Sequence, residues 1–175
     1  MSDKLKIHES IQGDATAIEL LYPEAFPDED LLSLVRDLSQ DSMIAMSLVG
    51  TIDSRVVGHV VFTNCGVVGR NVKAALLGPL AVAPIWQRQG IGSAIVRAGL
   101  QRLQDTAVHL VCVLGDPAYY GRLGFVQESL VEPPFPLPAE WDGAWQSQYL
   151  DDTTMPCAGK LSVPSQWLQP ALWAP

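Results

Sequence analysis

The sequence has few charged residues for its length, and it has no long apolar run. Charged residues make up 17% of the 175 residues, and 19 acidic residues outnumber 11 basic ones, for a net charge of −8. This balance argues against nucleic acid or an anionic membrane as a partner. No stretch approaches the roughly 18 uncharged apolar residues that span a bilayer, and the N-terminus lacks the apolar segment of a signal peptide. We therefore expect a globular, cytoplasmic protein.

Cysteine and histidine are also scarce. The three cysteines, Cys65, Cys112 and Cys157, are far apart and form no Cys-x-x-Cys pair. The three histidines are equally scattered, so no cluster has the spacing of metal ligands. The sequence predicts free thiols and no bound metal.

The length and composition favour one domain over residues 1–175, with a core at about 5–130 and an extension at 131–175. The extension contains eight of the thirteen prolines and four of the five tryptophans. Those tryptophans either line an acceptor pocket or cover the sheet, and the sequence leaves both interpretations open.

The apolar patterns predict a mixed α/β fold with a central strand–helix–strand crossover. Gly50 and Gly58 suggest β-bulges, and Gly78-Pro79 predicts either a bulge or a parting of its strand from the next one. The expected elements are helices within 13–41 (the first capped at Thr16, the second opening at Pro27), strands at 44–52 and 55–63 joined by a turn at Asp53-Ser54, a strand at 73–82, a helix at 90–104, a strand at 109–114, a short helix at 117–123, a strand from Phe125 and one late strand at 160–163.

The segment from Leu80 to Ser93 contains the most informative motif. A strand ends, a polar turn follows, and Gly90 and Gly92 open a helix. Backbone N–H groups in such a turn can converge on an anion such as pyrophosphate. A dinucleotide fingerprint would need a third glycine where Ile95 stands, and a Walker A loop would need Gly-Lys-Ser/Thr. The open alternative is a tight turn with no ligand.

Two motifs together resemble the GNAT family of N-acetyltransferases. Gln87-x-x-Gly90-x-Gly92 is similar to the family's acyl-CoA signature, and residues 119–125, Tyr-Tyr-Gly-Arg-Leu-Gly-Phe, are similar to its late tyrosine motif. Residues 115–122 and the extension look most like the bacterial YhbS-type members. The resemblance implies an α/β (α+β) fold with a mixed, mostly antiparallel sheet, a splayed central strand pair and helices on both faces.

The resemblance also implies a set of residues that bind acetyl-CoA. Backbone groups near Leu80 and Val82 would contact the pantetheine arm, and the glycine turn would bind the pyrophosphate, with Arg88 adding a charge. The residues expected to bind the cofactor are Leu80, Ala81, Val82, Gln87, Arg88, Gln89, Gly90, Ile91, Gly92, Ser93 and Tyr120.

For catalysis, Tyr120 is expected to be the general acid that protonates the departing thiolate, and the N–H of Val82 to contact the oxyanion. No carboxylate lies between Lys73 and Val82 to serve as the base. His59 is either that base or a structural histidine. Asp116 either orients the amine or pantetheine, or caps a helix.

The predicted reaction is direct transfer of an acetyl group from acetyl-CoA to a primary amine of a small molecule or peptide. A non-catalytic acyl-CoA or pantetheine-binding module and a nucleotide-binding domain are the alternatives, and a homodimer is one open oligomeric state. Residues 67–124 have a net charge of +4 inside acidic flanks, so we expect this segment to bind the anionic cofactor and the flanks to attract a cationic acceptor.

Overall fold

The computed structural model describes residues 4–151 and 156–175. The chain divides into two compact units: unit 1 comprises Met1–Phe62 and Gly78–Gln101, and unit 2 comprises Thr63–Leu77 and Arg102–Pro175. Neither unit is a continuous piece of chain, and the single domain stays a prediction. No helix of the described ranges is long and apolar enough to cross a membrane.

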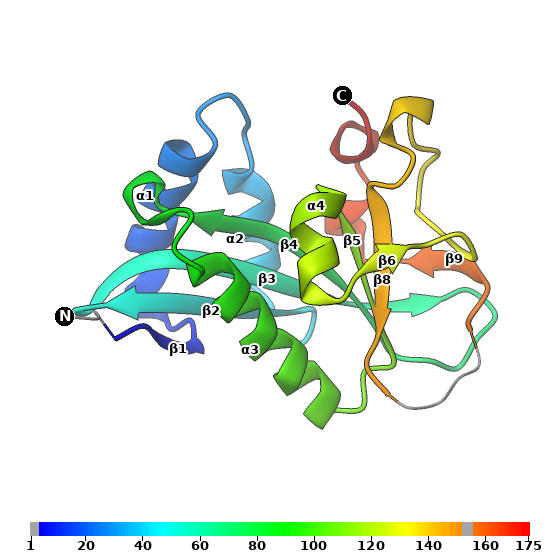
Figure 1. Cartoon of the computed structure of the whole chain (residues 1–175), viewed down its shortest axis with the longest axis horizontal. Helices are drawn as coiled ribbons and strands as arrows, with labels where there is room; N and C mark the ends of the chain where they lie inside the picture. Colours follow the sequence, from blue (N-terminus) through cyan, green and yellow to red (C-terminus); the bar gives the residue numbers. More distant parts are fainter. Residues whose placement is uncertain (1–3, 152–155) are drawn as a thin grey trace. The chain divides into compact units, whose positions relative to one another are not determined.

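Unit 1 combines a sheet with three α-helices (Figure 1). Its elements are β1 (Lys6–Glu9), α1 (Ala15–Ala25), α2 (Leu32–Ser39), β2 (Ala45–Ile52), the first part of β3 (Arg55–Val67), the last part of β4 (Ala74–Val82) and most of α3 (Ile91–Asp105).

The strands of unit 1 follow the order β1-β2-β3-β4. β1 and β2 are antiparallel, with Lys6 opposite Thr51 and Glu9 opposite Leu48. The predicted turn between β2 and β3 is confirmed, since Asp53 and Ser54 have φ values of 50° and 65°. Two consecutive residues with positive φ match the right-handed twist of a hairpin. β1 itself was absent from the sequence prediction because four residues give too short a pattern.

Helices cover both faces of the sheet in unit 1. Val49 belongs to a buried cluster with Tyr22 of α1 and Val35 of α2. The next residue, Gly50, faces α3, where an added Cβ would lie 2.8 Å from Cδ1 of Ile95. Successive strand residues point to opposite faces, so the α1–α2 pair and α3 lie on different sides. Gly50 pairs regularly with Ile7, so the expected bulge there is wrong. This glycine instead makes room for α3.

The two predicted helix starts are also wrong. α1 begins at Ala15, so Thr16 lies inside the helix rather than capping it. Asp14 precedes the helix and its carboxylate accepts the N–H of Ile11 at 2.9 Å. α2 begins at Leu32, five residues after Pro27. A short polar residue beside an apolar run marks a helix start only to within several residues.

Unit 2 contains the second part of β3, the first part of β4 and the C-terminal elements. These are β5 (Leu110–Leu114), α4 (Pro117–Tyr120), a 3-10 turn η3 (Gly121–Leu123), β6 (Val126–Gln127), β7 (Val131–Glu132), η4 (Ala139–Trp141), β8 (Trp145–Tyr149), β9 (Gly159–Ser162), η5 (Ser165–Trp167) and η6 (Pro170–Trp173).

The sheet of unit 2 is mixed and open, with strand order β3-β4-β5-β8-β6. β4 and β5 are parallel, and their register runs from Ala74 opposite Leu110 to Leu77 opposite Val113. Pairing ends one residue before Gly78-Pro79, where the sequence predicted that the strand parts from its neighbour. Proline has no N–H for the ladder. The β5–β8 and β6–β8 pairs are antiparallel.

In the described part of the extension, residues 131–151 and 156–175, there are three strands, not the one predicted. β9 lies near the expected position, but β7 and β8 were missed. β8 pairs with all five residues of β5, although its sequence Trp-Gln-Ser-Gln-Tyr does not alternate as a half-buried strand should. Two of its polar residues are buried with hydrogen-bond partners: Gln146 donates to the carbonyl of Gly115, and Ser147 donates to the carboxylate of Glu128.

Candidate active site

The glycine turn lies in unit 1, between β4 and α3. Arg88 and Gly90 have φ values of 63° and 80°, so the chain reverses sharply before the helix. The side-chain amides of the two glutamines point back to the turn: Gln87 donates to the carbonyl of Val82 at 2.9 Å and Gln89 to that of Ile85 at 3.1 Å. These side chains brace the turn, which leaves its backbone to meet a ligand.

The first turn of α3 has the donors that an anion needs. The N–H of Ala94 bonds to the carbonyl of Gly90 at 3.0 Å, so the N–H groups of Ile91, Gly92 and Ser93 precede the helical ladder. The positive end of the helix dipole adds to their field. A Cβ added at Gly90 would meet no atom within 4 Å. The turn therefore leaves open space beside unused donors, as a bound pyrophosphate requires.

The end of β4 also presents backbone donors. The N–H of Ala83 bonds to the carbonyl of Val57 in β3 at 2.9 Å. N–H directions alternate along a strand, so those of Leu80 and Val82 point away from β3. The side chain of Ala81 is buried in the cluster beneath α1. Leu80 and Val82 thus have the backbone orientation that a pantetheine contact requires.

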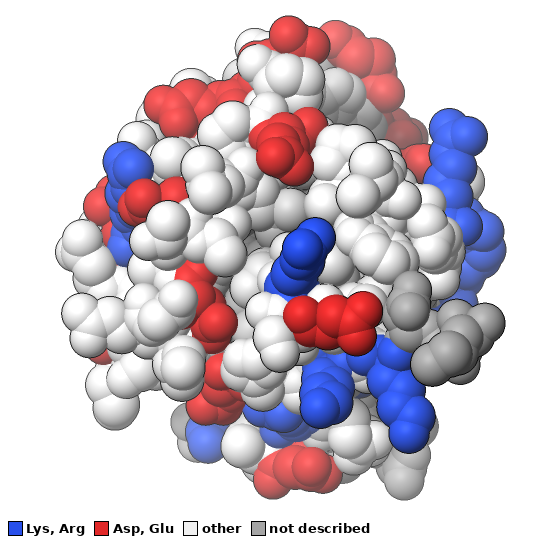
Figure 2. Space-filling view, turned by 90° about the vertical axis from the view of Figure 1, so that its left-hand side faces the viewer, with Lys and Arg blue, Asp and Glu red and all other residues white. Residues whose placement is uncertain are grey.

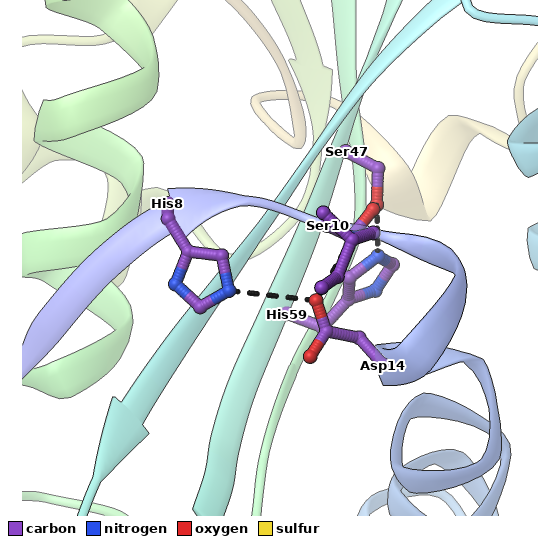
Figure 3. Close-up of polar contacts among 6 residues, drawn as sticks. His8, Ser10, Asp14, Ser47 and His59 are labelled. Atoms are coloured by element: carbon purple, nitrogen blue, oxygen red, sulfur yellow. Dashed lines mark hydrogen bonds and ion pairs between the residues drawn. The ribbon is translucent and has the colours of Figure 1, made fainter. Parts of the chain in front are cut away.

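His59 lies at the centre of a hydrogen-bonded chain in unit 1 (Figure 3). Its Nδ1 is 2.7 Å from the hydroxyl of Tyr22, and its Nε2 is 2.7 Å from Oγ of Ser47. Ser10 donates to Ser47 at 2.7 Å. The ring has no exposed surface, and burial lowers the pKa of His59 to about 4, with Asp14 acting weakly in the opposite direction. The imidazole is therefore neutral near pH 7.

Asp116 and Tyr120 lie at the two ends of α4 in unit 2. The Asp116 carboxylate is exposed and accepts the N–H of Ala118 at 2.9 Å, so it caps the helix. The Tyr120 ring makes edge contacts with Tyr119 and Phe125, at centroid distances of 5.0 and 5.7 Å. Burial raises the pKa of Tyr120 well above its usual value. The phenol therefore keeps its proton across the physiological range.

A cavity of about 460 Å³ in unit 2 adjoins the start of α4. Three acidic residues and one tryptophan are among the residues that line it, namely Asp116, Glu140, Asp142 and Trp141. The four tryptophans of the extension have two kinds of environment. Trp145, Trp167 and Trp173 are buried, with Trp173 in ring contact with both others, whereas Trp141 lines the cavity.

The cysteines are free, and two of them are unreactive by environment. Burial raises the pKa of Cys65 to about 12 and that of Cys112 well above its usual value. Cys112 lies in the apolar strand β5, where all four neighbouring residues of the strand are apolar. Within residues 4–151 and 156–175, no group of three or more His, Cys, Asp or Glu residues could hold a metal ion.

The predicted site residues therefore form two groups. Unit 1 contains His59, the end of β4 and the glycine turn. The glycine turn follows the end of β4 directly, and the hydrogen bond from Gln87 to Val82 links the two. Unit 2 contains Asp116 and Tyr120. Sequence reasoning missed the carboxylates of Glu140 and Asp142, because a Pro-rich segment has no periodicity that would indicate which side chains face a cavity.

Comparison with known proteins is consistent with this geometry. A family model described as the acetyltransferase (GNAT) domain matches residues 45–127. The uncharacterised N-acetyltransferase YjhQ of Escherichia coli K12 is 30% identical over 161 residues, which cover 88% of this chain and 89% of YjhQ. YhbS, an uncharacterised N-acetyltransferase of the same organism, is 35% identical over 120 residues, which cover 68% of this chain and 72% of YhbS.

Solved structures show the same fold. The structure of Escherichia coli YhbS in complex with CoA has a TM-score of 0.85 and 28% identity, covering 97% of this chain and 94% of YhbS. A GNAT acetyltransferase from Brucella melitensis in complex with acetyl-CoA has a TM-score of 0.76 and 24% identity, covering 95% and 99% of the two chains. The predicted mixed, mostly antiparallel open sheet is confirmed by these likenesses.

Proposed function

Since the chain belongs to the GNAT family of N-acetyltransferases, we propose that it transfers the acetyl group of acetyl-CoA directly to a primary amine. The observation that carries the proposal is the glycine turn with its unused N–H groups at the start of α3. In this proposal the backbone of residues 87–93 binds the pyrophosphate, and the side chain of Arg88 adds a positive charge. Leu80, Ala81 and Val82 contact the pantetheine arm through the β4 backbone. The reaction takes place in the cytoplasm.

The chemistry proposed requires no covalent enzyme intermediate. The neutral amine attacks the thioester carbonyl, the N–H of Val82 stabilises the oxyanion, and the C–S bond breaks as the C–N bond completes. Tyr120 donates its proton to the leaving thiolate and is reprotonated from solvent. The raised thiol pKa values of Cys65 and Cys112 support direct transfer, because a protonated thiol is a poor nucleophile.

The proton released by the amine has no carboxylate on β4 to receive it. His59 has no exposed surface, so we assign it at most an indirect role, reached through the hydroxyls of Ser47 and Ser10. Its low pKa makes it a weak base. Water can receive the proton that the attacking nitrogen loses, and an amine that is already partly neutral at the working pH spares only the earlier deprotonation of the ammonium form.

We assign the binding site of the acceptor amine to the acidic cavity of unit 2. An acidic cavity favours a cation, so we infer that the amine binds in its protonated form and loses a proton before it attacks. Asp116, Glu140 and Asp142 supply negative charge, and the indole of Trp141 supplies a face for cation–π contact. On the face of the molecule shown in Figure 2, acidic and basic side chains lie side by side in several places, so that face does not have a single sign of charge. A small amine or the amino group of a short peptide matches the volume of the cavity.

Release of the CoA thiol, measured over a panel of amines from about pH 6 to about pH 9, tests the proposal. We expect acetyl-CoA to bind in calorimetry and cationic primary amines to accelerate thiol release. Binding without release at any pH would favour the alternative, a non-catalytic acyl-CoA-binding module. Tighter binding of ATP or NAD than of CoA would exclude both and favour a nucleotide-binding domain.

Asp116→Asn tests the acceptor assignment. Asparagine keeps an oxygen for the N–H of Ala118, so the helix cap survives while the charge is lost. We expect the KM of a cationic amine to rise about tenfold, the Kd of CoA to stay unchanged, and salt to reduce the difference. Glu132→Gln is the matched control, an exposed carboxylate of unit 2 that does not line this cavity. An unchanged amine KM in Asp116→Asn would contradict the assignment.

A further inference from the structure

The ring of Tyr120 occupies the space that a side chain at position 115 would fill. A Cβ added to Gly115 would lie 2.4 Å from Cε2 and 3.0 Å from Cδ2 of Tyr120. Separations under 3.0 Å are not tolerated, so either the ring or the backbone would have to move. Gly115 does not have a positive φ, so an alanine there conflicts with the ring and not with the backbone conformation.

The backbone of Gly115 is bonded on both sides by the C-terminal extension. Its N–H donates to the carbonyl of Ala144 at 2.9 Å. Its carbonyl accepts the side-chain amide of Gln146 at 3.1 Å. Gln146 is 1% exposed, and breaking a buried hydrogen bond leaves a polar group unsatisfied. The backbone at position 115 is therefore the part that resists movement, and the Tyr120 ring is the part that would yield.

The remaining contacts of the ring restrict where it can go. Tyr119 and Phe125 pack against it edge to face, at 85° and 78°. Among the described residues, the Tyr120 hydroxyl has no hydrogen-bond partner, so ring packing alone sets its direction. A general acid has to lie within hydrogen-bond reach of the atom that it protonates. A small rotation of this ring would therefore move the hydroxyl out of hydrogen-bond distance of that atom.

From these contacts we infer that Gly115 and Gln146 are positioning residues for the Tyr120 hydroxyl, and that the extension thereby takes part in catalysis. The inference rests on the acid role of Tyr120 in the proposed function. It assigns a further task to β8, which also pairs with β5 and β6. Gln146 fixes the Gly115 carbonyl, Gly115 leaves room for the ring, and the ring directs the hydroxyl.

Gly115→Ala in the full-length protein tests this inference. We expect kcat for acetyl transfer to fall about 10- to 100-fold, as in Tyr120→Phe, with the Kd of CoA unchanged. The double variant Gly115→Ala/Tyr120→Phe should be no slower than Tyr120→Phe, because a residue that acts only through the hydroxyl has no effect once the hydroxyl is gone. An acetyl thioester of a more acidic aryl thiol should restore the rate of both single variants, since its thiolate leaves without an acid.

Gly121→Ala is the matched control. This glycine directly follows Tyr120, has a φ of −57°, and an added Cβ would meet no atom within 4 Å, so kcat should stay at the wild-type value. Gln146→Met provides a second test should Gly115→Ala be unstable. It keeps a buried side chain of similar length and removes the donor to Gly115, and kcat should fall about fivefold.

The outcomes separate the inference from the proposed function. Normal kcat in Gly115→Ala or in Gln146→Met, or a double variant much slower than Tyr120→Phe, would overturn the inference while leaving acetyl transfer intact. Normal turnover by Tyr120→Phe would remove the acid and the inference together. No transfer by the wild-type chain to any amine would instead contradict the proposed function.

Discussion

The glycine turn of unit 1 and the α4 segment of unit 2 each follow a strand and open a helix, but they offer different chemistry. The turn offers backbone N–H groups at Ile91–Ser93, and its glutamine side chains bond back to the turn itself. The α4 segment offers one side chain, Tyr120, whose ring is placed by its neighbours.

This difference predicts how each of the two segments responds to substitution. A site made of backbone donors depends on conformation and on empty space, so glycine is the residue that matters. A site made of one side chain depends on the packing that orients it. Substitutions in the turn should therefore change cofactor affinity, and substitutions around Tyr120 should change kcat.

The largest effect is expected from Gly90→Asp. The added carboxylate would enter the open space beside the N–H groups of α3, where it would exclude and repel a pyrophosphate. We expect CoA binding to fall below detection in calorimetry. Gly69→Asp is the control, because Gly69 has nearly the same φ, 78° against 80°, and is equally open. Equal loss of binding in both variants would mean that strain, not the anion site, is responsible.

His59→Gln tests whether the buried hydrogen-bonded chain of unit 1 contributes to stability, separately from the glycine turn. The folded-state pKa of His59 is about 4 against an ordinary 6.5. The unfolded chain therefore binds the proton more readily, and the stability from this group is full above pH 6.5 and is lost as pH falls toward 4. The loss amounts to about 3 kcal/mol.

Urea unfolding from pH 7 to pH 4 measures this contribution. The free energy of unfolding of the wild-type protein should fall more steeply with decreasing pH than that of His59→Gln, whatever the offset between them at pH 7. Parallel curves would show that His59 does not titrate as its burial requires.

The smallest effect is expected from Arg88→Glu. Arg88 is exposed, and exposed charges contribute little in salt solution. We expect the Kd of CoA to rise about fivefold at low salt and the difference to shrink as salt increases. Arg97→Glu, an exposed arginine on α3, is the control for net charge. If Arg88→Glu binds CoA as the wild type does, the positive charge of residues 67–124 is incidental and backbone donors suffice.

The parts of the site that could be predicted are those made by consecutive residues. The turn at Gly90 and Gly92, the parting of β4 at Gly78-Pro79 and the α4 segment each depend on local chain conformation. Gly115 and Tyr120 also lie within six residues of each other. No sequence pattern, however, distinguishes a glycine that leaves space for a neighbouring ring from one that only ends a strand. The chain Tyr22–His59–Ser47–Ser10 joins α1, β3, β2 and the residue that follows β1, so no short segment contains its signal.

The sequence by itself determined the longer helices and strands and the two motifs of this protein, because glycine, proline and apolar periodicity act on the chain within a few residues. Only the tertiary structure decided that His59 is buried and neutral, that Trp141 lines a cavity while Trp173 is covered, and that β8 pairs with β5. These outcomes depend on burial and on hydrogen bonds between residues far apart in the chain. Desolvation sets both the pKa of His59 and the polar pairing of Gln146, and it exists only once distant segments have packed.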